Sequence, residues 1–313
     1  MKILTRTCDF RPRGHVVGCG VQGSKCLALG LSAGKGGKLS IGWSLDGELG
    51  DPMFAEKLSK LTGARHFWAS PSEQGGLQVE TTRTIEMPAG EFATKSGKSD
   101  YFVTQIKSRF VKDTVVIGGL CMKGEEIDGG RVVPAEHNVG AGAIKESVNR
   151  DYRYWYSTMG ISRPHIASTA LALANAYLAL YPAEKRRANP FRLVLLKGRS
   201  VYRAVLMDDW KYIDEVLLPR MDGDDASPDV IAARMQGWID YFTRQHPAVV
   251  QDRTIDPLVV AVKETHVSSF EHWDLWDENA IDKIDMTEAV AGPILSNRDI
   301  APIAFGMALQ GGC

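Results

Sequence analysis

The sequence contains no long hydrophobic run. None of its 313 residues lies in a stretch of about 18 consecutive apolar residues, the length that a membrane-spanning helix needs. The first residues, MKILTRTCDFRPRG, also lack the apolar core of a secretory signal peptide. We therefore expect a cytoplasmic protein that does not insert directly into a membrane.

Net charge is also nearly absent. The 37 lysines and arginines are balanced by 38 aspartates and glutamates, so the formal net charge is -1. Without an overall positive field, no nucleic-acid partner is expected. One local basic run, Lys185 to Arg187, follows an expected helix end. We expect a solvated turn that complements the helix dipole, with contact to phosphate or a lipid headgroup as the alternative.

Cysteine is scarce and shows no pattern. The 5 cysteines form no CxxC pair, and their odd number favours reduced thiols in a cytosol-like compartment. We expect them to pack as small buried hydrophobic residues. They are Cys8, Cys19, Cys26, Cys121 and Cys313.

Motifs for nucleophilic catalysis and metal binding are missing as well. There is no GxSxG motif, and no two of the 7 histidines have the HxxxH spacing. The acidic cluster of Asp222, Asp224 and Asp225 lacks the glycine and the terminal glutamate of an EF-hand. The sequence therefore predicts no catalytic residue and no metal site.

What the chain does contain is typical of an α/β protein with two lobes. Hydrophobic residues make up 44% and charged residues 24%, which are ordinary globular values, and the length favours two lobes. In the first fifty residues, HVVGCG, KCLALGLS and KLSIGWSLDG predict three strands joined by tight turns. A helix is expected over residues 51–63, with Asp51 as N-cap and Pro52 as its first residue.

The rest of the chain predicts an inserted subdomain and a second lobe. Residues 64–135 carry short strand-like runs between polar and glycine-rich segments, which indicates a small β-rich insertion. Helices are expected over residues 143–160 and 166–182, the second packed on both sides because it is apolar nearly all round. A three-stranded meander over 191–219, a helix over 227–246, a strand over 256–264 and an apolar closing helix over 301–312 follow.

The glycines of the first expected turn match the outline of a dinucleotide fingerprint. Gly18, Gly20 and Gly23 form a GxGxxG motif after an apolar run, and Asp46 lies at the end of a later strand. However, RPRGHVV is a poor central strand, and the following residues do not predict a phosphate-binding helix. An NAD(P)-binding enzyme is therefore kept as an alternative.

Four segments follow one another along the chain: VVGCGVQGSKCLALGLSAGKGGKL, YWYSTMGISRPHIASTALALANAY, LVLLKGRSVYRAVLMDDW and IAPIAFGMALQGG. Their order, with the elements between them, resembles the actin-like (ribonuclease H-like) fold, and more narrowly the PilM family of type IV pilus and type II secretion assembly proteins. This resemblance implies a first lobe over residues 1–180 with the insertion at about 64–135. The second lobe covers 181–313, and its closing helix returns toward the first.

The resemblance also implies a nucleotide cleft between two hairpins, each with an aspartate that organises magnesium and water. Those aspartates fall on Gly20 and Leu196, and the family's lysine falls on Leu27. Its paired glycines fall near Lys263 and Glu264. ATP hydrolysis is thus expected to be lost and no cofactor is expected, although ATP binding stays open. The residues of this degenerate cleft are Gly18, Gly20, Gly23, Ser24, Gly198 and Ser200.

What the resemblance implies about function is a cytoplasmic scaffold recruited to the inner membrane by a partner. In that family a short cytoplasmic tail of an inner-membrane protein docks on the actin-like lobe. A similar partner is expected here, and homo-oligomers are possible. The alternative is an actin-fold ATPase with displaced carboxylates, such as Asp46 or Asp208.

Overall fold

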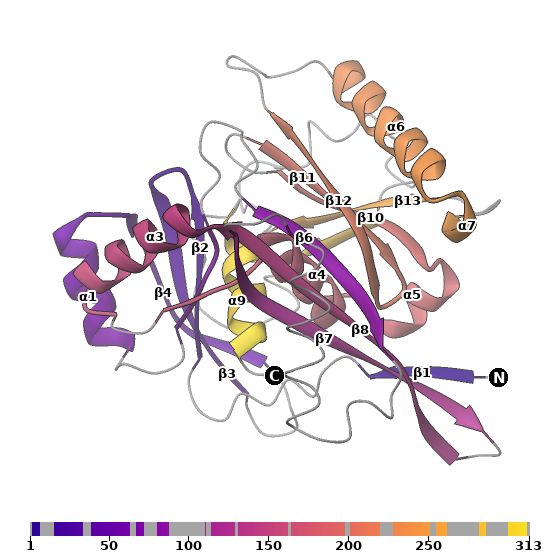
Figure 1. Ribbon diagram of the computed structural model, residues 1–313, viewed down its shortest axis with the longest axis horizontal. Helices are drawn as coiled ribbons and strands as arrows, with labels where there is room; N and C mark the ends of the chain where they lie inside the picture. Colours follow the sequence, from indigo (N-terminus) through magenta and orange to yellow (C-terminus); the bar gives the residue numbers. More distant parts are fainter. Residues whose placement is uncertain are drawn as a thin grey trace.

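The fold is described by a computed structural model whose two five-stranded sheets face each other across a pair of helices (Figure 1). We call each sheet, with the helices on its outer face, a lobe. The described residues are 2–6, 16–33, 39–62, 67–71, 80–87, 110, 114–128, 131–161, 164–197, 201–219, 228–250, 255–261, 282–285 and 300–311.

The first sheet begins with the three strands expected from the first fifty residues. These strands form an antiparallel meander, and two shorter strands then join its far side in parallel. Across the sheet the order is β4 (Leu39–Glu48), β3 (Lys25–Ala33), β2 (Val16–Gln22), β5 (Phe67–Ala69) and β9 (His165–Ile166).

The second sheet repeats this topology. Its meander is also antiparallel, two parallel strands again complete the sheet, and the turn between β11 and β12 lies at Asp209 and Trp210. Across the sheet the order is β12 (Lys211–Pro219), β11 (Val201–Asp208), β10 (Phe191–Lys197), β13 (Asp256–Ala261) and β14 (Asp282–Asp285). Both lobes thus carry a three-stranded meander whose first strand lies at the centre of the sheet.

A third sheet lies beside the two lobes and is built mainly from the glycine-rich middle of the chain. All of its pairings are antiparallel, and its β6 contacts β12 of the second lobe. Its order is β1 (Lys2–Arg6), β7 (Thr114–Asp128), β8 (Arg131–Lys145) and β6 (Glu80–Met87). The strand β8 continues to Lys145, so Ile144 is in a strand and the helix expected from residue 143 begins later.

Two helices cover the outer face of the first sheet. In α1 (Pro52–Thr62) the predicted N-cap is confirmed, because the backbone N–H of Met53 donates to Asp51 Oδ1 at 2.9 Å. In α3 (Glu146–Thr158), Tyr152 and Tyr156 are buried. After α3, Gly160 ends the helix with a φ of +77°. The apolar side chains of α1 and α3 pack against the outer face of the first sheet and form an outer core with it.

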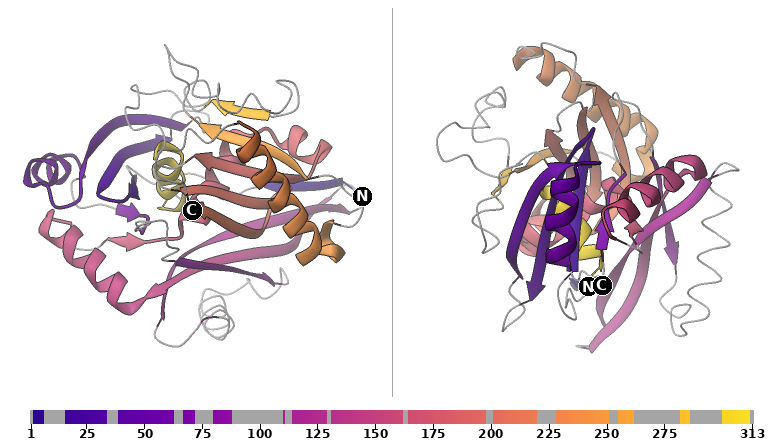
Figure 2. Two further views of the ribbon diagram at one scale, coloured as in Figure 1. Left: turned by 90° about the horizontal axis from the view of Figure 1, so that it is seen from above. Right: turned by 90° about the vertical axis from the view of Figure 1, so that its left-hand side faces the viewer.

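The outer face of the second sheet is crossed by α6 (Pro228–Gln245), which is followed by the short α7 (Pro247–Val250) (Figure 2). From α6, Trp238 and Phe242 are buried. His246 Nε2 lies 3.2 Å from Asp214 Oδ2 on β12, which joins the end of this helix to the sheet.

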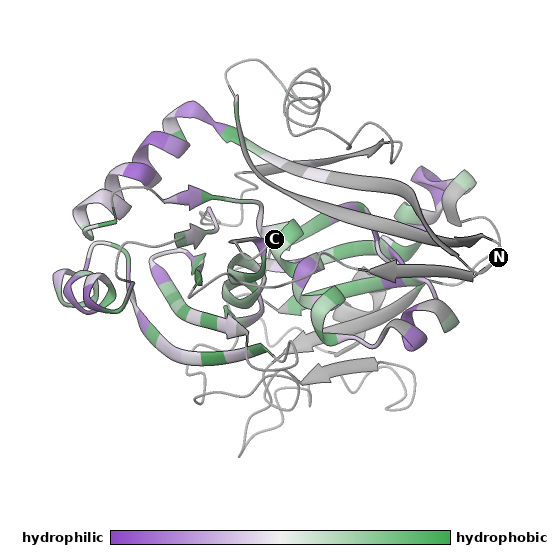
Figure 3. Cartoon of the chain, turned by 90° about the horizontal axis from the view of Figure 1, so that it is seen from below, coloured by the Kyte–Doolittle hydropathy of each residue, from purple (hydrophilic) through white to green (hydrophobic). Residues whose placement is uncertain are grey.

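Between the two lobes lie α4 (Thr169–Leu180) and α9 (Ala301–Gly311), which pack against each other. Every residue from Thr169 to Leu178 is buried, which confirms the prediction of a helix packed on both sides. Each helix crosses over: α9 follows the second sheet but contacts β2 and β3, and α4 follows the first sheet but contacts β10 and β11. Figure 3 shows α9 mostly hydrophobic and the solvent-facing α3 mostly hydrophilic.

The short α5 (Ala183–Ala188) links the lobes and corrects one expectation. The basic run on it was predicted to be solvated, but only 3% of the Arg186 side chain is exposed. The predicted dipole complement is nevertheless present, because Arg186 Nη1 donates to the carbonyls of Leu178 and Tyr181 at 3.1 and 2.7 Å. The charge is buried because it has these acceptors at the end of α4.

Candidate functional site

The candidate site is the inner face of the two central hairpins, β2–β3 and β10–β11. The first hairpin closes with a two-residue turn at Gly23 and Ser24, since Gln22 pairs with Lys25. Gly23 has a φ of +60° and both turn residues are exposed. A two-residue turn with a left-handed first residue strongly favours glycine at that place.

Gly18 and Gly20 have a different role from Gly23. A Cβ added to Gly18 would lie 2.0 Å from the Ala304 carbonyl oxygen, and one added to Gly20 would lie 2.5 Å from Ile300 Cγ2. Both glycines therefore let α9 lie directly on the backbone of β2. Because α9 covers this face, the two glycines act in packing here and are not open to a ligand from that side.

This geometry corrects the dinucleotide alternative. A GxGxxG fingerprint needs a helix whose N-terminus follows the glycines and faces the pyrophosphate. Here the chain after Gly23 turns directly into β3, which pairs antiparallel with β2. The NAD(P)-binding hypothesis is therefore wrong for these glycines, since the motif lacks the helix that would bind phosphate.

Equivalent rows of residues run across the two inner faces. In the first lobe, Gly20 pairs with Leu27, and Leu27 pairs with Asp46. Residues directly opposite in an antiparallel pair point to the same face of the sheet. Leu27 is fully buried in the core between the lobes, so the position that resemblance gives to the lysine is occupied by apolar packing.

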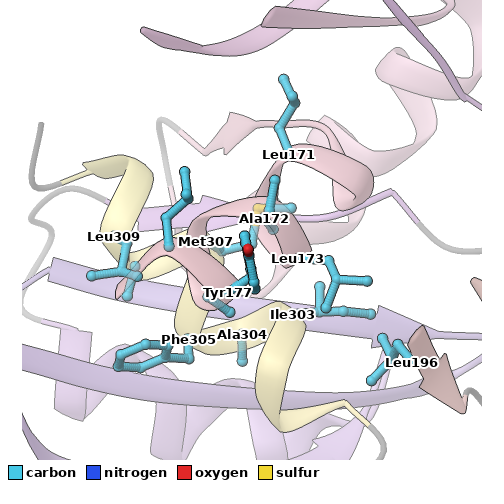
Figure 4. Close-up of a cluster of buried hydrophobic side chains, with 14 of the residues drawn as sticks. Leu171, Ala172, Leu173, Tyr177, Leu196, Ile303, Ala304, Phe305, Met307 and Leu309 are labelled. Carbon is cyan, nitrogen blue, oxygen red and sulfur yellow. The ribbon is translucent and has the colours of Figure 1, made fainter. Parts of the chain in front are cut away.

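In the second lobe, the corresponding row is Leu196, Arg203 and Leu217. Leu196 is 3% exposed and belongs to the same interlobe core, on the side of Ile303 of α9 (Figure 4). Neither Gly20 nor Leu196 has a side-chain oxygen to offer a cation. The two positions that the resemblance assigns to metal-organising aspartates thus carry no side-chain metal ligand.

A buried ion pair lies beside Leu196. Arg203 points to the same face as Leu196 because the two are directly opposite, and its Nη1 donates to Glu215 Oε2. The side chains are 2% and 4% exposed. A permanently charged guanidinium next to this position disfavours a divalent cation there, and the Glu215 carboxylate is engaged by the arginine.

The two displaced carboxylates lie in different places. Asp46 shares the row of Gly20 but is two strands away, about 10 Å at the usual strand spacing. Asp208 pairs with Phe191 at the opposite end of β10 from Leu196, roughly 16 Å along the strand. Only Asp46 is therefore near the first hairpin, and Asp208 belongs to the β11–β12 turn.

Two further groups at the first hairpin could not be assigned from the sequence. The hydroxyl of Ser70, at the end of β5, accepts a hydrogen bond from the Val21 N–H at 2.9 Å, and Ser70 is fully buried. Gln22 lies on the same strand as Gly18 and Gly20, faces the same side of the sheet, and is 2% exposed. No local motif marks either residue, because their role depends on strands joined across 49 positions of sequence.

The outer face of the same hairpin carries two of the five cysteines, Cys19 and Cys26, and these two are buried as expected. Both are free thiols with no exposed surface. A hydrogen bond with Cys19, followed by burial, raises the pKa of the Cys26 thiol far above its usual value. Burial likewise raises the pKa of Tyr156. Cys26 therefore stays a thiol at neutral pH and is not an activated nucleophile.

The structure describes some of the predicted site residues and not others. Gly18, Gly20, Gly23 and Ser24 come together on one hairpin, whereas Gly198 and Ser200 lie outside the described residues, as do Lys263 and Glu264. The pairing of the two hairpin turns across the lobes stays a prediction. Across the part of the chain that the structure describes, no three His, Cys, Asp or Glu side chains gather as a metal site would need.

Comparison with known proteins identifies the fold. No protein-family model matches the sequence, and no curated protein matches it. Among solved structures, the PilM-PilN type IV pilus biogenesis complex aligns with a TM-score of 0.56 at 15% identity, covering 96% of this chain and 99% of that one.

Two other similar structures align less closely. A Bacteroides thetaiotaomicron protein with an actin-like ATPase fold and unknown function has a TM-score of 0.40 at 9% identity, covering 88% of this chain and 92% of that one. The ethanolamine utilization protein EutJ from Carboxydothermus hydrogenoformans has a TM-score of 0.38 at 9% identity, with 98% and 92% covered.

The comparisons and the two repeated sheets agree on the architecture. Among the described helices, none has both the length and the apolar character to cross a bilayer. The chain is an α/β protein with the two-lobed actin-like fold, to which a small additional sheet is attached.

Proposed function

We propose that this protein is a catalytically degenerate, PilM-like scaffold in a type IV pilus or type II secretion assembly. It works in the cytoplasm, where it binds the cytoplasmic tail of an inner-membrane partner. The observation that carries the proposal is the apolar inner face: Gly20 lies under α9 and Leu196 is buried, at the two positions to which the resemblance assigns the aspartates of an actin-like ATPase. The similarity to the PilM of a PilM-PilN complex supports the choice of system.

In this proposal the protein no longer catalyses a reaction, and its remaining activity is to bind a partner protein. Phosphoryl transfer in this architecture depends on carboxylates that organise magnesium and water. With an arginine–glutamate pair beside Leu196 and a leucine at position 27, the inner face favours packing over phosphate chemistry. A rigid protein that has lost its cofactor chemistry can still present a surface to a partner.

The enzymatic alternative is tested by thermal unfolding with and without magnesium-ATP. We expect no change in Tm, whereas a ligand at one hundred times its Kd would add about 2.7 kcal/mol to the free energy of unfolding. The matched variant is Asp46→Asn, which removes the carboxylate near the first hairpin. A magnesium-ATP shift in the wild type that disappears in Asp46→Asn would show that magnesium-ATP binds through Asp46 and would favour the displaced-carboxylate alternative over the proposal.

The partner is tested by cross-linking the protein in its own cells, isolating it in mild detergent, and identifying attached proteins. We expect an inner-membrane protein of a pilus or secretion system. A synthetic peptide with the cytoplasmic tail of that protein should then bind the purified chain, and a scrambled peptide should not. Recovery of soluble metabolic enzymes alone, or failure of the tail peptide to bind, would contradict the adaptor function.

A further inference from the structure

The strand β4 forms an accessible edge of the first sheet. It stands at one end of the strand order and, within the described residues, pairs with β3 alone. Of its ten residues only Ile41 is buried, whereas every residue of the central strand β2 is buried. An edge strand presents backbone N–H and C=O groups that another extended chain can bind. We call this side of the strand the β4 edge.

A β-bulge limits the regular part of the β4 edge. The register with β3 shifts between Gly30 and Leu31, which leaves Gly42 as an extra residue on β4. A bulge interrupts the ladder of hydrogen bonds and bends the strand. The regular run is therefore 43–48, about 20 Å long at the usual rise per residue. A run of this length accommodates one short extended segment.

Helix α1 runs beside this edge. A Cβ added to Gly47 of β4 would lie 2.1 Å from Phe54 Cδ2, so α1 lies directly on this strand. On one flank of α1, Ser59 faces the end of α3, because a Cβ on Gly160 would lie 3.1 Å from Ser59 Oγ. Figure 2 likewise shows α1 on the β4 side of the sheet and α3 on the other side. The flank of α1 that is turned away from α3 therefore lies along the β4 edge.

That flank carries exposed apolar side chains. At about 100° per residue, Met53, Lys57 and Leu61 form one stripe on the side of α1 opposite to Ser59. Met53 is 65% and Leu61 is 44% exposed. They are separated by about 12 Å along the helix, close to the roughly 13 Å between residues four apart in a strand. An extended segment on the β4 edge can therefore place same-face side chains against both ends of the stripe.

The two faces of the β4 edge differ in chemistry. On the outer face, Trp43 and Leu45 are partly buried against the outer core, on the side of α1. On the inner face lie Asp46, opposite Leu27, and Glu48, which pairs with Lys25. An added strand therefore meets apolar side chains on one face and carboxylates on the other. Opposite charges favour cross-strand neighbours, so this arrangement favours basic side chains on the inner face of the added strand.

We propose that the β4 edge and the Met53–Leu61 stripe bind an extended segment of a partner protein by strand addition. The segment alternates apolar and basic side chains, and its backbone pairs with residues 43–48. A second copy of β4 is disfavoured as the occupant, because it would bring the carboxylates of both copies together. The inference rests on the proposed scaffold function for the existence of a partner, and it names the surface and the chemistry of the bound segment.

The test uses a labelled peptide of seven residues that alternate lysine and valine as the probe, with the full purified chain. We expect saturable binding in fluorescence anisotropy. The unlabelled peptide should slow amide exchange in residues 39–48, measured by mass spectrometry, because edge N–H groups then donate to the peptide. A peptide that alternates glutamate and valine should bind at least about tenfold more weakly, and so should the lysine–valine peptide with a central proline.

Met53→Gln with Leu61→Gln tests the stripe, and Tyr154→Gln is the matched control, because Tyr154 is 66% exposed on the other helix of the same layer. Both variants change exposed side chains and should keep the wild-type Tm. The double variant should bind the peptide at least about tenfold more weakly, since two apolar contacts are lost, whereas the control should bind it as the wild type does.

Three results would each overturn the strand-addition site. They are no binding of the lysine–valine peptide, protection of another strand in place of β4, and equal affinity of the wild type and the double variant. A dimer that protects β4 without peptide would assign the edge to a second copy and overturn it as well. None of these results contradicts the scaffold function, which is tested separately by isolating the partner from cells.

Discussion

The two lobes share a strand order but differ in how a helix meets the central hairpin. In the first lobe, Gly18 and Gly20 bring the backbone of α9 onto β2. In the second lobe, Val194 and Leu196 keep side chains between β10 and the interlobe helices. With the same strand order, the helix therefore contacts the hairpin backbone in the first lobe, whereas large side chains fill the space between hairpin and helices in the second.

A second difference concerns charge. The inner row of the first lobe ends at Asp46 near the edge of the sheet, whereas that of the second lobe has Arg203 buried at its centre and paired with Glu215. A fold that held magnesium between two equivalent hairpins would need carboxylates at both. The comparison teaches that the inner faces of the two hairpins are filled in different ways, one by the close packing of α9 and one by a buried ion pair.

The largest expected effect is that of Gly18→Ala in the first lobe. The new Cβ would meet the Ala304 carbonyl oxygen at 2.0 Å, so α9 would have to shift away from β2. We expect a loss of more than about 4 kcal/mol in the free energy of unfolding, measured with a chemical denaturant. Gly42→Ala is the control, because its Cβ would meet only the Gly30 carbonyl at 3.9 Å. Equal stability of the two variants would contradict the backbone contact.

Next in size is Arg203→Met in the second lobe. It leaves the carboxylate of Glu215 buried without its cation, which costs about 3–5 kcal/mol. In the double variant Arg203→Met with Glu215→Leu we expect most of that loss to be recovered, since no buried charge is left. Urea unfolding of the single and double variants measures both values. A double variant no more stable than Arg203→Met would show that the loss of stability does not come from an unpaired buried carboxylate at Glu215.

A smaller effect is expected for Ser168→Ala at the start of α4. The Ser168 hydroxyl accepts from the Leu171 N–H at 3.3 Å and lies 2.9 Å from Thr82 Oγ1. Losing the N-cap and the hydroxyl pair should lower the free energy of unfolding by about 1–2 kcal/mol. Ser168→Thr keeps the hydroxyl and serves as the control in thermal unfolding. A loss confined to Ser168→Ala supports the cap, and equal losses would assign the effect to steric fit.

The smallest effect concerns Glu56 and Lys60 on the exposed face of α1, which pair at 2.6 Å. Hydrogen bonding and the charge of Lys60 hold the pKa of the Glu56 carboxyl below its ordinary value. A depressed carboxyl pKa contributes stability above the unfolded-state pKa, and that contribution is lost as pH falls through the folded-state pKa. In Lys60→Ala the pKa of Glu56 should rise toward its ordinary value in an NMR titration, whereas Lys57→Ala should change it less.

Much of the local structure could be predicted. The Asp51 cap, the three-stranded meanders and the buried α4 follow from short patterns of apolar, glycine and capping residues, because these depend on neighbours in sequence. The start of α3 was placed too early because the residues around Ile144 also suit a strand, and pairing with β7 decided the outcome.

The candidate site could be predicted only in part. Gly18 and Gly20 were expected to form a cleft with Gly23, but only Gly23 has the left-handed φ of a turn. The role of the other two depends on α9, nearly three hundred residues away, and no local pattern reports that contact. Likewise Arg186 looked like any basic residue after a helix, because its ion pair with Asp209, 23 positions further along the chain, forms only when α5 packs beside the β11–β12 turn.

The sequence by itself determined which side chains the hairpins carry. Gly20 and Leu196 have no side-chain oxygen to offer a metal, and that follows from residue type alone. Only the tertiary structure decided what surrounds them: α9 lies against Gly20, and a buried ion pair lies beside Leu196. The physical reason is that side-chain chemistry is local, whereas burial and hydrogen-bond partners depend on segments distant in the chain that meet only when it folds.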